Sequence, residues 1–405
     1  MANTLKFGNG QWATGNGTAL AYNDENANFK PLPFDFTRAS SGTTVNQSGL
    51  IETVGSGIPR IDFLGNTKGA LLLEPSRTNS LPYSADFSTW SATGGASVVG
   101  NKLGVGGSND AFEFSSNGSA NTRLYYSLSN TGELSFSVFA KKNTLDYIAL
   151  YGNGGSNPRV WFNLANGTLG NQEGAGTGSI ESYGNGWYRC TMNWNSASLV
   201  NVRIYNSNAN DVFGGTAGSV FIQYSQLEEG SYATSYIPTS GSAVTRVRDL
   251  SDTQNLSHVI GQTEGVIFYD AILVHKSTST SEDLFELSID DGSANNAFFI
   301  NNYNNTLTVL LKSGGSTSFS NNSFNPTEGA RYKLGFAYKQ NDFALYINGN
   351  QIATDSSGTV PSMNQITFGN YYDNRVNFQS NVKVNDFKLY NTRLTNSELA
   401  ALTQV

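Results

Sequence analysis

Alternation of apolar and polar residues is the clearest pattern in the middle of the chain. From 134 to 140 the even-numbered residues are apolar, and Ser135 and Ser137 lie between them. From 188 to 194 the even-numbered residues, including Cys190, are apolar or aromatic, and the odd-numbered ones are polar. A period of two places alternate side chains on opposite faces of a strand. Both stretches are therefore predicted to be half-buried strands, with Cys190 as a small core residue.

The last third of the chain shows the same signal in shorter pieces. Strands are predicted at 265–270, 284–289, 332–337 and 343–347, and an Asn348-Gly349 turn follows the last of them. Near the end, Thr395-Asn-Ser-Glu398 has the form of a capping box, which satisfies free amides where a helix begins. We therefore predict an all-β protein, built of tandem antiparallel β-sandwich (jelly-roll) modules with one short C-terminal helix.

The pattern divides the chain into three parts. Residues 1–82 hold brief extended pieces separated by Gly, Pro and Asn, too short to form a core of their own. They are predicted to pack against another domain or another chain, and we interpret them as an attachment segment. Residues 83–248 and 249–405 are each predicted to form a β-sandwich.

Composition narrows the class of protein. Charged residues make up only 14% of the 405 residues, whereas 43 are glycine, and Asn-Gly pairs recur, as suits many tight hairpin turns. The net charge of −7, without a cluster of Lys and Arg, gives no support for nucleic-acid binding. A single cysteine excludes an intrachain disulfide, and two histidines make a zinc site improbable. No apolar run reaches the roughly 18 residues of a membrane span, and the N-terminus lacks a secretory core, so no membrane insertion is expected.

Two groups of motifs carry a family resemblance. The first comprises Phe36–Ser41, Gly49–Glu52, Pro59–Asp62 and Leu71–Asn79. The second comprises Gly186–Cys190, Gln226–Gly230, Ala233–Thr239 and Val244–Arg246. Together they resemble structural proteins of tailed bacteriophages: fibre, tail or head-appendage subunits with carbohydrate-binding-like jelly rolls. The last module resembles laminin-G/concanavalin-A-like lectins.

That resemblance implies a function and a setting. It implies a virion protein, made in the cytoplasm of a bacterial host and exposed on the particle, that contacts other virion proteins and host-surface glycans. It also implies a homo-oligomer, a trimer as in many phage fibres. Two alternatives stay open: a purely structural capsid or tail decoration without glycan binding, and a polysaccharide depolymerase.

Catalytic patterns are scarce. Concanavalin-like glycosidases carry carboxylates as E-x-D-x-x-E on one strand face. The nearest match is Glu282-Asp283-Leu-Phe-Glu286, where adjacent carboxylates would point to opposite faces, so a solvated strand start is predicted. Ser288–Gly292 is predicted to be a turn. We therefore expect a protein that is not an enzyme.

Metal and cofactor signals are equally weak. Asn23–Asn28 and Asp290-Asp291 are rich in oxygen ligands, and a structural Ca²⁺ is one reading of them. The EF-hand spacing is absent, so polar turns are favoured and no cofactor is expected.

Saccharides bind by stacking on exposed aromatic rings beside hydrogen-bonding polar groups. Two sets of residues offer this combination. They are Tyr371, Tyr372, Asp373 and Asn374 in the last module, and Tyr147, Tyr151, Arg159 and Trp161 in the middle one. The alternative is that these residues belong to the core or to a subunit interface.

Overall fold

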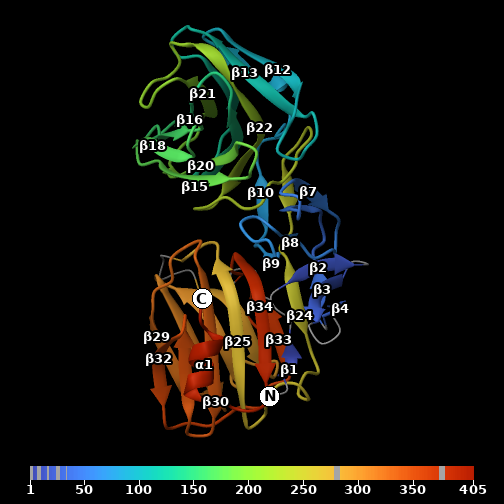
Figure 1. Cartoon of the computed structure of the whole chain (residues 1–405). Coiled ribbons are helices and arrows are strands. Elements are labelled where there is room, and N and C mark those ends of the chain that lie inside the picture. Colours follow the sequence, from blue (N-terminus) through green and yellow to red (C-terminus); the bar gives the residue numbers. More distant parts are fainter. Residues whose placement is uncertain are drawn as a thin grey trace. The chain divides into compact units, whose positions relative to one another are not determined.

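The computed structural model describes residues 3–6, 11–15, 18–23, 28–32, 34–277, 283–373 and 379–405. Nearly all regular structure is antiparallel β, with one short helix at the C-terminal end, which confirms the predicted all-β class (Figure 1). The chain divides into two compact units. The first comprises Met1–Ser41, Val54–Ser76 and Val247–Val405, and the second comprises Gly42–Thr53 and Arg77–Arg246.

Two large sheets form the first unit. One has the order β32-β31-β30-β25-β34-β9-β8, with β1 also paired to β34, and the other has the order β29-β28-β27-β26-β33-β24-β5. The strands of the first sheet are β1 (Asn3–Lys6), β8 (Ile61–Asp62), β9 (Ala70–Leu73), β25 (Glu264–Leu273), β30 (Arg331–Lys339), β31 (Phe343–Ile347), β32 (Asn350–Asp355) and β34 (Val382–Tyr390). Those of the second are β5 (Asp35–Thr37), β24 (Leu250–Thr253), β26 (Asp283–Asp290), β27 (Ala297–Tyr303), β28 (Thr306–Ser313), β29 (Ser316–Phe324) and β33 (Gln365–Phe368). A small sheet adds β2 (Trp12–Gly15), β3 (Thr18–Asn23) and β4 (Asn28–Pro31).

The second unit is a sandwich of two six-stranded sheets, ordered β11-β14-β21-β16-β17-β18 and β12-β13-β22-β15-β20-β19. The strands of the first sheet are β11 (Ser91–Thr93), β14 (Arg123–Ser127), β16 (Tyr147–Asn153), β17 (Arg159–Asn163), β18 (Thr168–Glu173) and β21 (Asn201–Ser207). Those of the second are β12 (Ala96–Lys102), β13 (Ala111–Asn117), β15 (Gly132–Lys142), β19 (Thr177–Ser182), β20 (Trp187–Ser196) and β22 (Ala217–Glu229). Two-stranded pairs add β6 (Gly42–Val45) with β7 (Ile51–Val54), and β10 (Arg77–Asn79) with β23 (Val244–Arg246); one 3-10 turn, η1, spans Phe87–Thr89.

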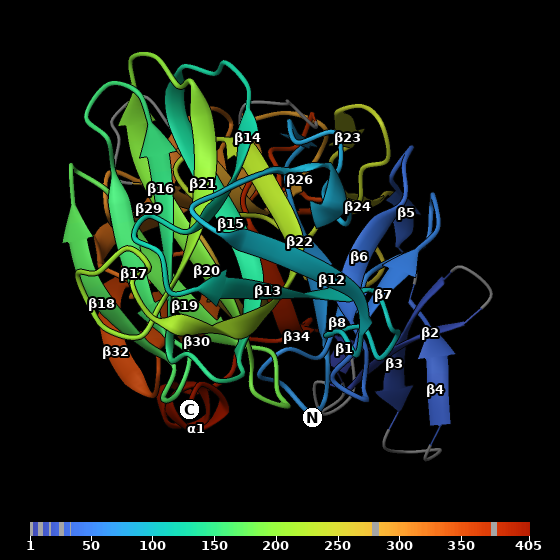
Figure 2. The same cartoon turned by 90° about the horizontal axis from the view of Figure 1, so that it is seen from above.

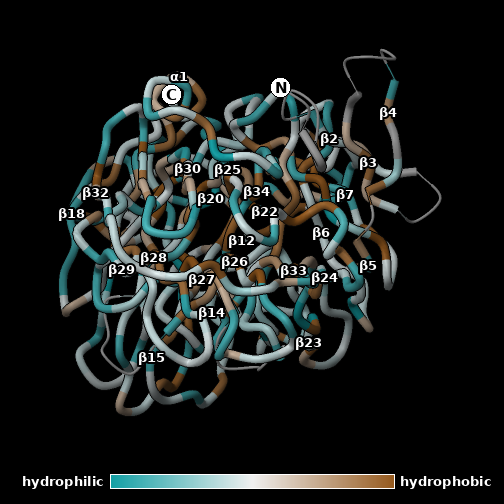
Figure 3. The backbone as a smooth tube through the Cα atoms, turned by 90° about the horizontal axis from the view of Figure 1, so that it is seen from below, coloured by the Kyte–Doolittle hydropathy of each residue, from teal (hydrophilic) through white to brown (hydrophobic). Residues whose placement is uncertain are grey.

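The alternating pattern fixes which face of each strand is buried. Leu134 and Phe136 of β15 pack with Cys190 and Met192 of β20 in the core between the two sheets. Hydrophobic and hydrophilic positions are accordingly interspersed along the strands (Figure 3). The predicted strand at 188–194 and the core position of Cys190 are confirmed.

The opposite face of β15, β20 and β22 is also buried, which the sequence pattern did not predict. Arg189 and Ser137 are both nearly inaccessible and hydrogen-bond to each other. Residues 233–239 lie against this face: the side chain of Gln226 accepts from the backbone N–H of Ile237 (2.6 Å) and that of Glu228 accepts from the N–H of Thr234 (2.9 Å). Two of the motifs that carry the family resemblance are therefore partners within one layer.

The helix α1 (Asn396–Leu402) begins as predicted. Thr395 is its N-cap and accepts from the N–H of Glu398, while the Glu398 carboxylate accepts from the N–H of Thr395. Leu394 and Leu399 pack on Val266 and Ala344 of the adjacent sheet. The capping box thus fixes where the chain leaves its last strand.

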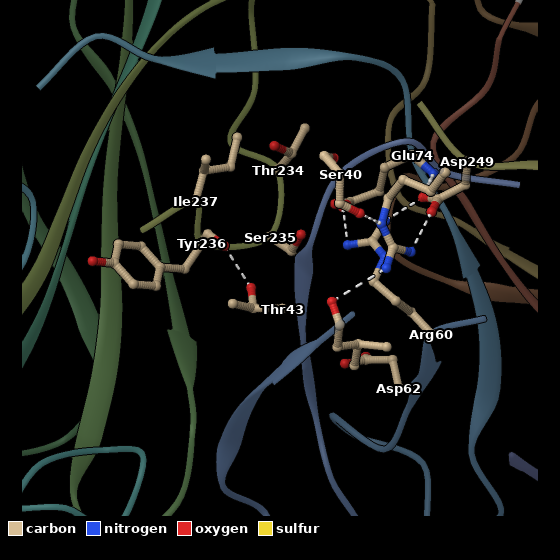
Figure 4. Close-up of polar contacts among 12 residues, drawn as sticks. Ser40, Thr43, Arg60, Asp62, Glu74, Thr234, Ser235, Tyr236, Ile237 and Asp249 are labelled. Carbon is tan, nitrogen blue, oxygen red and sulfur yellow. Dashed lines mark hydrogen bonds and ion pairs between the residues drawn. The ribbon is translucent and has the colours of Figure 1, made fainter. Parts of the chain in front are cut away.

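Residues 1–82 do not form a separate body. Trp12, Leu71 and Leu73 belong to the main core of the first unit, and the Trp12 indole donates to the backbone carbonyl of Asn385 (2.7 Å). Gly42–Thr53 belongs instead to the second unit, where the Thr43 hydroxyl donates to the carbonyl of Tyr236 (2.6 Å; Figure 4). The division of the chain into an attachment segment at 1–82 and two following sandwiches stays a prediction.

A buried ion network links the N-terminal residues of the first unit to residue 249. Arg60 pairs with Glu74 (2.7 Å) and with Asp249 (Figure 4), and Asp249 also pairs with Arg38 (3.0 Å). All four side chains are almost fully buried. Although burial alone would lower the pKa of the Arg60 guanidinium, Asp249 and Glu74 raise it above its ordinary value. The backbone N–H of Glu74 also donates to the Asp249 carboxylate (2.9 Å), so the network ties chain segments together.

Removing the shared carboxylate should destabilise the first unit strongly. In the variant Asp249→Ala, two buried guanidinium groups lose their common partner, and we expect a loss of about 3–5 kcal/mol in the free energy of unfolding. Denaturant titration measures the difference. The matched control is Glu264→Ala, because the Glu264–Lys339 pair (3.3 Å) is solvent-exposed and should contribute less than about 1 kcal/mol. Equal effects of the two variants would contradict a structural role for the network.

Candidate functional site

Aromatic and cationic side chains form rows on the outer face of the sheet β11-β14-β21-β16-β17-β18, whose strands run side by side (Figure 2). In one row, Tyr125 lies opposite Arg203, Arg203 opposite Tyr151, Tyr151 opposite Arg159, and Arg159 opposite Glu173. Leu124, Ile148, Leu150 and Ile204 point the other way, into the core. Alternation in the strands therefore leaves the row on the surface away from the core.

A second row runs beside the first. Arg123 of β14 lies opposite Tyr205 of β21, two residues along from the Tyr125–Arg203 pair. The tripeptides Arg123-Leu-Tyr125 and Arg203-Ile-Tyr205 thus pair antiparallel, with each arginine opposite the tyrosine of the other. We call the surface formed by Arg123, Tyr125, Tyr151, Arg159, Arg203 and Tyr205 the Arg–Tyr face.

Cation–π contacts organise the Arg–Tyr face. The Arg203 guanidinium lies 4.9 Å from the centroid of the Tyr151 ring, and Arg123 lies 5.9 Å from that of Tyr205. Arg159 lies 6.0 Å from Tyr151. Such contacts place the guanidinium groups of this face against the Tyr151 and Tyr205 rings.

The four candidates of the middle module occupy this one sheet face. Tyr151 and Arg159 are central to the row and half-buried. Tyr147 lies at one end of the same strand and accepts from the Asn163 amide (2.9 Å). Trp161 is nearly inaccessible, because Phe213 packs on its indole with centroids 4.7 Å apart.

The segment that carries Phe213 forms a wall at this end of the face. The Trp161 indole N–H donates to the carbonyl of Val212 (3.0 Å), and the N–H of Asn121 donates to the carbonyl of Phe213 (2.9 Å). Phe213 also lies 4.3 Å from Tyr205, centroid to centroid. Trp161 therefore supports the wall from beneath. Whether any of the four candidates contacts a saccharide stays a prediction.

Charge is balanced at one edge of the face and unbalanced at its centre. Arg159 pairs with Glu173 (2.6 Å). Arg203 instead donates to the side chains of Asn201 (2.7 Å) and Tyr205 (3.3 Å). Within the described part of the chain, neither Arg203 nor Arg123 has a carboxylate partner.

Sequence reasoning missed Arg123, Tyr125, Arg203 and Tyr205. The signal was present in the two Arg-x-Tyr tripeptides, each with an apolar residue at its centre. Only the register of β14 against β21 brings them together, and register between strands so far apart in the chain is not readable from one sequence.

The candidates of the last module lie on the first unit. Tyr371 packs against Phe285 (4.5 Å between centroids), Phe299 (5.2 Å) and Tyr372 (4.5 Å), and both tyrosines are half-buried. Asp373 is exposed, and Asn374 lies outside the described residues. The two rings thus extend an aromatic cluster on β26 and β27, and their contact with a glycan stays a prediction.

Strand β26 begins at Asp283, which is half-buried, and Glu282 lies outside the described residues. Glu286 is the bulged residue between Phe285 and Leu287 and is fully buried, with its carboxyl accepting from the Tyr332 hydroxyl. Desolvation raises its pKa to about 8, opposed by that hydrogen bond. The second carboxyl oxygen has no partner in the described structure, so Glu286 is a buried acid away from the surface.

The oxygen-rich sequences are used by turns where they are described. Asp290 accepts from the N–H of Gly292 (2.8 Å), and Asp291 accepts from the N–H of Ser293 (3.0 Å). The turn predicted over Ser288–Gly292 begins only at Asp291, because Ser288–Asp290 are the buried end of β26. Residues 24–27 lie outside the described part. Among the residues that the structure describes, no group of three or more His, Cys, Asp or Glu side chains could hold a metal ion. Within the same residues, no helix is long and apolar enough to cross a bilayer.

Comparisons with known proteins give no family. No protein-family model matches the chain, and no curated protein matches it. Among solved structures, it aligns with a Ruminococcus gnavus IT-sialidase CBM40 bound to α2,3-sialyllactose at 18% identity and a TM-score of 0.31, over 37% of this chain and 91% of that one. A Streptococcus pneumoniae NanB sialidase aligns at 14% identity and 0.31, over 37% of this chain and 26% of that one. A Limulus polyphemus SAP-like pentraxin aligns at 13% identity and 0.27, over 34% and 68%. At these values the likeness carries no argument about ligand or activity.

Burial of Glu286 makes stability depend on pH. The folded pKa of about 8 lies above the ordinary value of about 4.3, so between these pH values the unfolded state loses a proton that the folded state keeps. The free energy of unfolding should therefore fall as pH rises from about 4.3 to 8, by up to about 1.4 kcal/mol per unit, and then level off. Glu286→Gln keeps the neutral form and should remove this component of the slope, measured by denaturant titration at several pH values. The half-buried control Glu264→Gln should leave the slope unchanged. An unchanged slope in Glu286→Gln would contradict the buried acid.

Proposed function

We propose that this chain is a non-enzymatic virion protein of a tailed bacteriophage, a fibre or appendage subunit that contacts host-surface glycans through the Arg–Tyr face of its second unit. The observation that carries the glycan part is the row Tyr125–Arg203–Tyr151–Arg159. It places aromatic rings beside guanidinium donors on adjacent strands. Rings stack on the apolar faces of sugars, and guanidinium groups donate to their oxygens.

The virion part rests on the ordered motifs of the sequence. In the structure several of these motifs supply buried ion pairs: Arg38 and Arg60 pair with Asp249, and Arg60 also pairs with Glu74. Buried residues of this kind fix the architecture, whereas the exposed faces of the strands can differ between proteins that share it. This supports a role as a modular particle component, with other virion proteins as partners and a homotrimer as its form.

Single sites of this kind are weak. A dissociation constant near the millimolar range corresponds to about 4 kcal/mol. Several copies on one particle would raise the apparent affinity by effective concentration, without any new contact. A trimer on a virion therefore suits a shallow binding face.

Loss of the central ring should weaken glycan binding. In the variant Tyr151→Ala, a multivalent form of the full chain should bind at least tenfold more weakly to host glycans on an array, because Tyr151 is the ring between two arginines. Tyr83→Ala is the control, since Tyr83 is an exposed tyrosine of the same unit outside this sheet. The double variant Tyr371→Ala/Tyr372→Ala tests the first unit in the same assay.

The other outcomes decide between the alternatives. Binding that only the Tyr371/Tyr372 variant loses would move the site to the first unit. Absence of binding by the unaltered chain to any host glycan would favour a purely structural decoration. Release of reducing ends from host polysaccharide would indicate a depolymerase.

A second experiment tests the virion assignment. Cryo-electron microscopy of the particle that encodes this chain should place it at the surface of the head or tail in threefold-related copies. Absence of its density from purified particles would contradict the assignment, whatever the glycan result.

A further inference from the structure

We infer that the Arg–Tyr face selects glycans that carry carboxylate groups, and that Arg203 and Arg123 are the residues that bind these carboxylates. The inference rests on the proposed glycan contact and specifies its chemical class. It is drawn from the unbalanced charge on the face.

The two arginines lack the carboxylate partners that several other arginines of the chain have. Arg60, Arg331 and Arg393 each pair with a carboxylate within the chain. Arg203 instead binds the neutral side chains of Asn201 and Tyr205. Arg123 donates weakly to the carbonyl of Asn121 (3.5 Å), and its buried Nε has no acceptor among the described residues.

Their placement concentrates positive charge. Because Arg123 faces Tyr205 and Arg203 faces Tyr125 on the neighbouring strand, the two arginines are diagonal neighbours on one sheet face. Diagonal neighbours in antiparallel sheets lie about 7–8 Å apart, and like charges on adjacent strands are unfavourable. No carboxylate of the described chain offsets this pair, so an anion from outside would be stabilised there.

The geometry favours a carboxylated sugar over a simple anion. A guanidinium group presents a planar fork that matches both oxygens of a carboxylate. The forks lie beside the half-buried Tyr125 and Tyr151 rings, which suit the apolar face of a pyranose, while the buried Tyr205 ring supports them from within the layer. The chain as a whole carries a net charge of −7 and repels polyanions, so attraction must come from this local pair.

Lys102 supplies a charge control outside the Arg–Tyr face. It belongs to β12, in the other sheet of the same unit, and pairs with Glu113 (2.9 Å). Lys102→Gln therefore removes one positive charge from the unit without changing a residue of the face. Arg203→Gln and Arg123→Gln each remove a charge from the face itself, and Arg203→Lys keeps the charge while removing the fork.

The experiment measures binding of the full chain to carboxylated oligosaccharides and their carboxyl-reduced counterparts. The probes are oligogalacturonate, hyaluronan oligosaccharides and oligosialic acid, each beside its reduced form, together with a sulfated neutral oligosaccharide of similar charge. At least one carboxylated probe should bind tenfold or more tightly than its reduced form. Arg203→Gln should lose at least tenfold, Arg123→Gln severalfold, Arg203→Lys an intermediate amount, and Lys102→Gln less than twofold.

Circular dichroism and thermal unfolding of each variant separate misfolding from loss of binding. If a Gln variant unfolds early, Arg203→Lys and the reduced probes still decide the question, because they leave the fold intact. Equal binding of carboxylated and reduced probes, or binding of the sulfated probe alone, would overturn the inference. If the inference fails but neutral glycans still bind in a Tyr151-dependent way, the proposed glycan contact stands. If no glycan binds at all, both the inference and the proposed glycan contact are wrong.

Discussion

The Asp249 carboxylate is the interaction on which the first unit depends most. It accepts from Arg38 and Arg60 and from the backbone N–H of Glu74, so residues 175 or more positions apart in the sequence meet at one buried group. Two buried guanidinium groups would be costly without it. Because the network positions the chain on both sides of 249, it also sets where β24 begins and pairs with β5 and β33. The sandwich of the last module is thereby completed by strands from the first part of the sequence.

In the second unit, too, buried polar side chains hold distant chain segments together through hydrogen bonds. Asn79 donates to the carbonyl of Ile237 and accepts from the N–H groups of Leu81 and Leu227, while Gln226 binds the backbone at Ile237. These residues belong to the motifs that resemble phage structural proteins. Their role in the structure is to satisfy backbone groups in a covered layer. The resemblance therefore describes how the chain is assembled, and the surface that meets a ligand must be sought among other residues.

Sequence reasoning succeeded where the controlling interactions are local. The period of two at 188–194 and the capping box at Thr395 need only neighbouring residues, and both are as predicted. It failed where contacts between distant segments determine which side chains are buried or brought together. Glu286 lies in a bulge and is buried against Tyr332, and the outer face of β22 is covered by residues 233–239. Tyr151 and Arg159 could be proposed from composition, but Arg123 and Arg203 could not, since they join the site only through the register of β14 and β21.

Ligands of lectin-like sandwiches are expected on rim loops, where sequence varies freely. The Arg–Tyr face differs, because its side chains stand on paired strands whose spacing the hydrogen-bond ladder fixes. The Tyr151 and Tyr205 rings each lie against a guanidinium group, and Phe213 packs on Trp161 at one end. Such a surface loses little conformational entropy on binding and tolerates little change of ligand shape. Recognition on strands is thus suited to one repeating glycan presented many times, in which affinity comes from the number of copies and selectivity from the rigid position of each arginine.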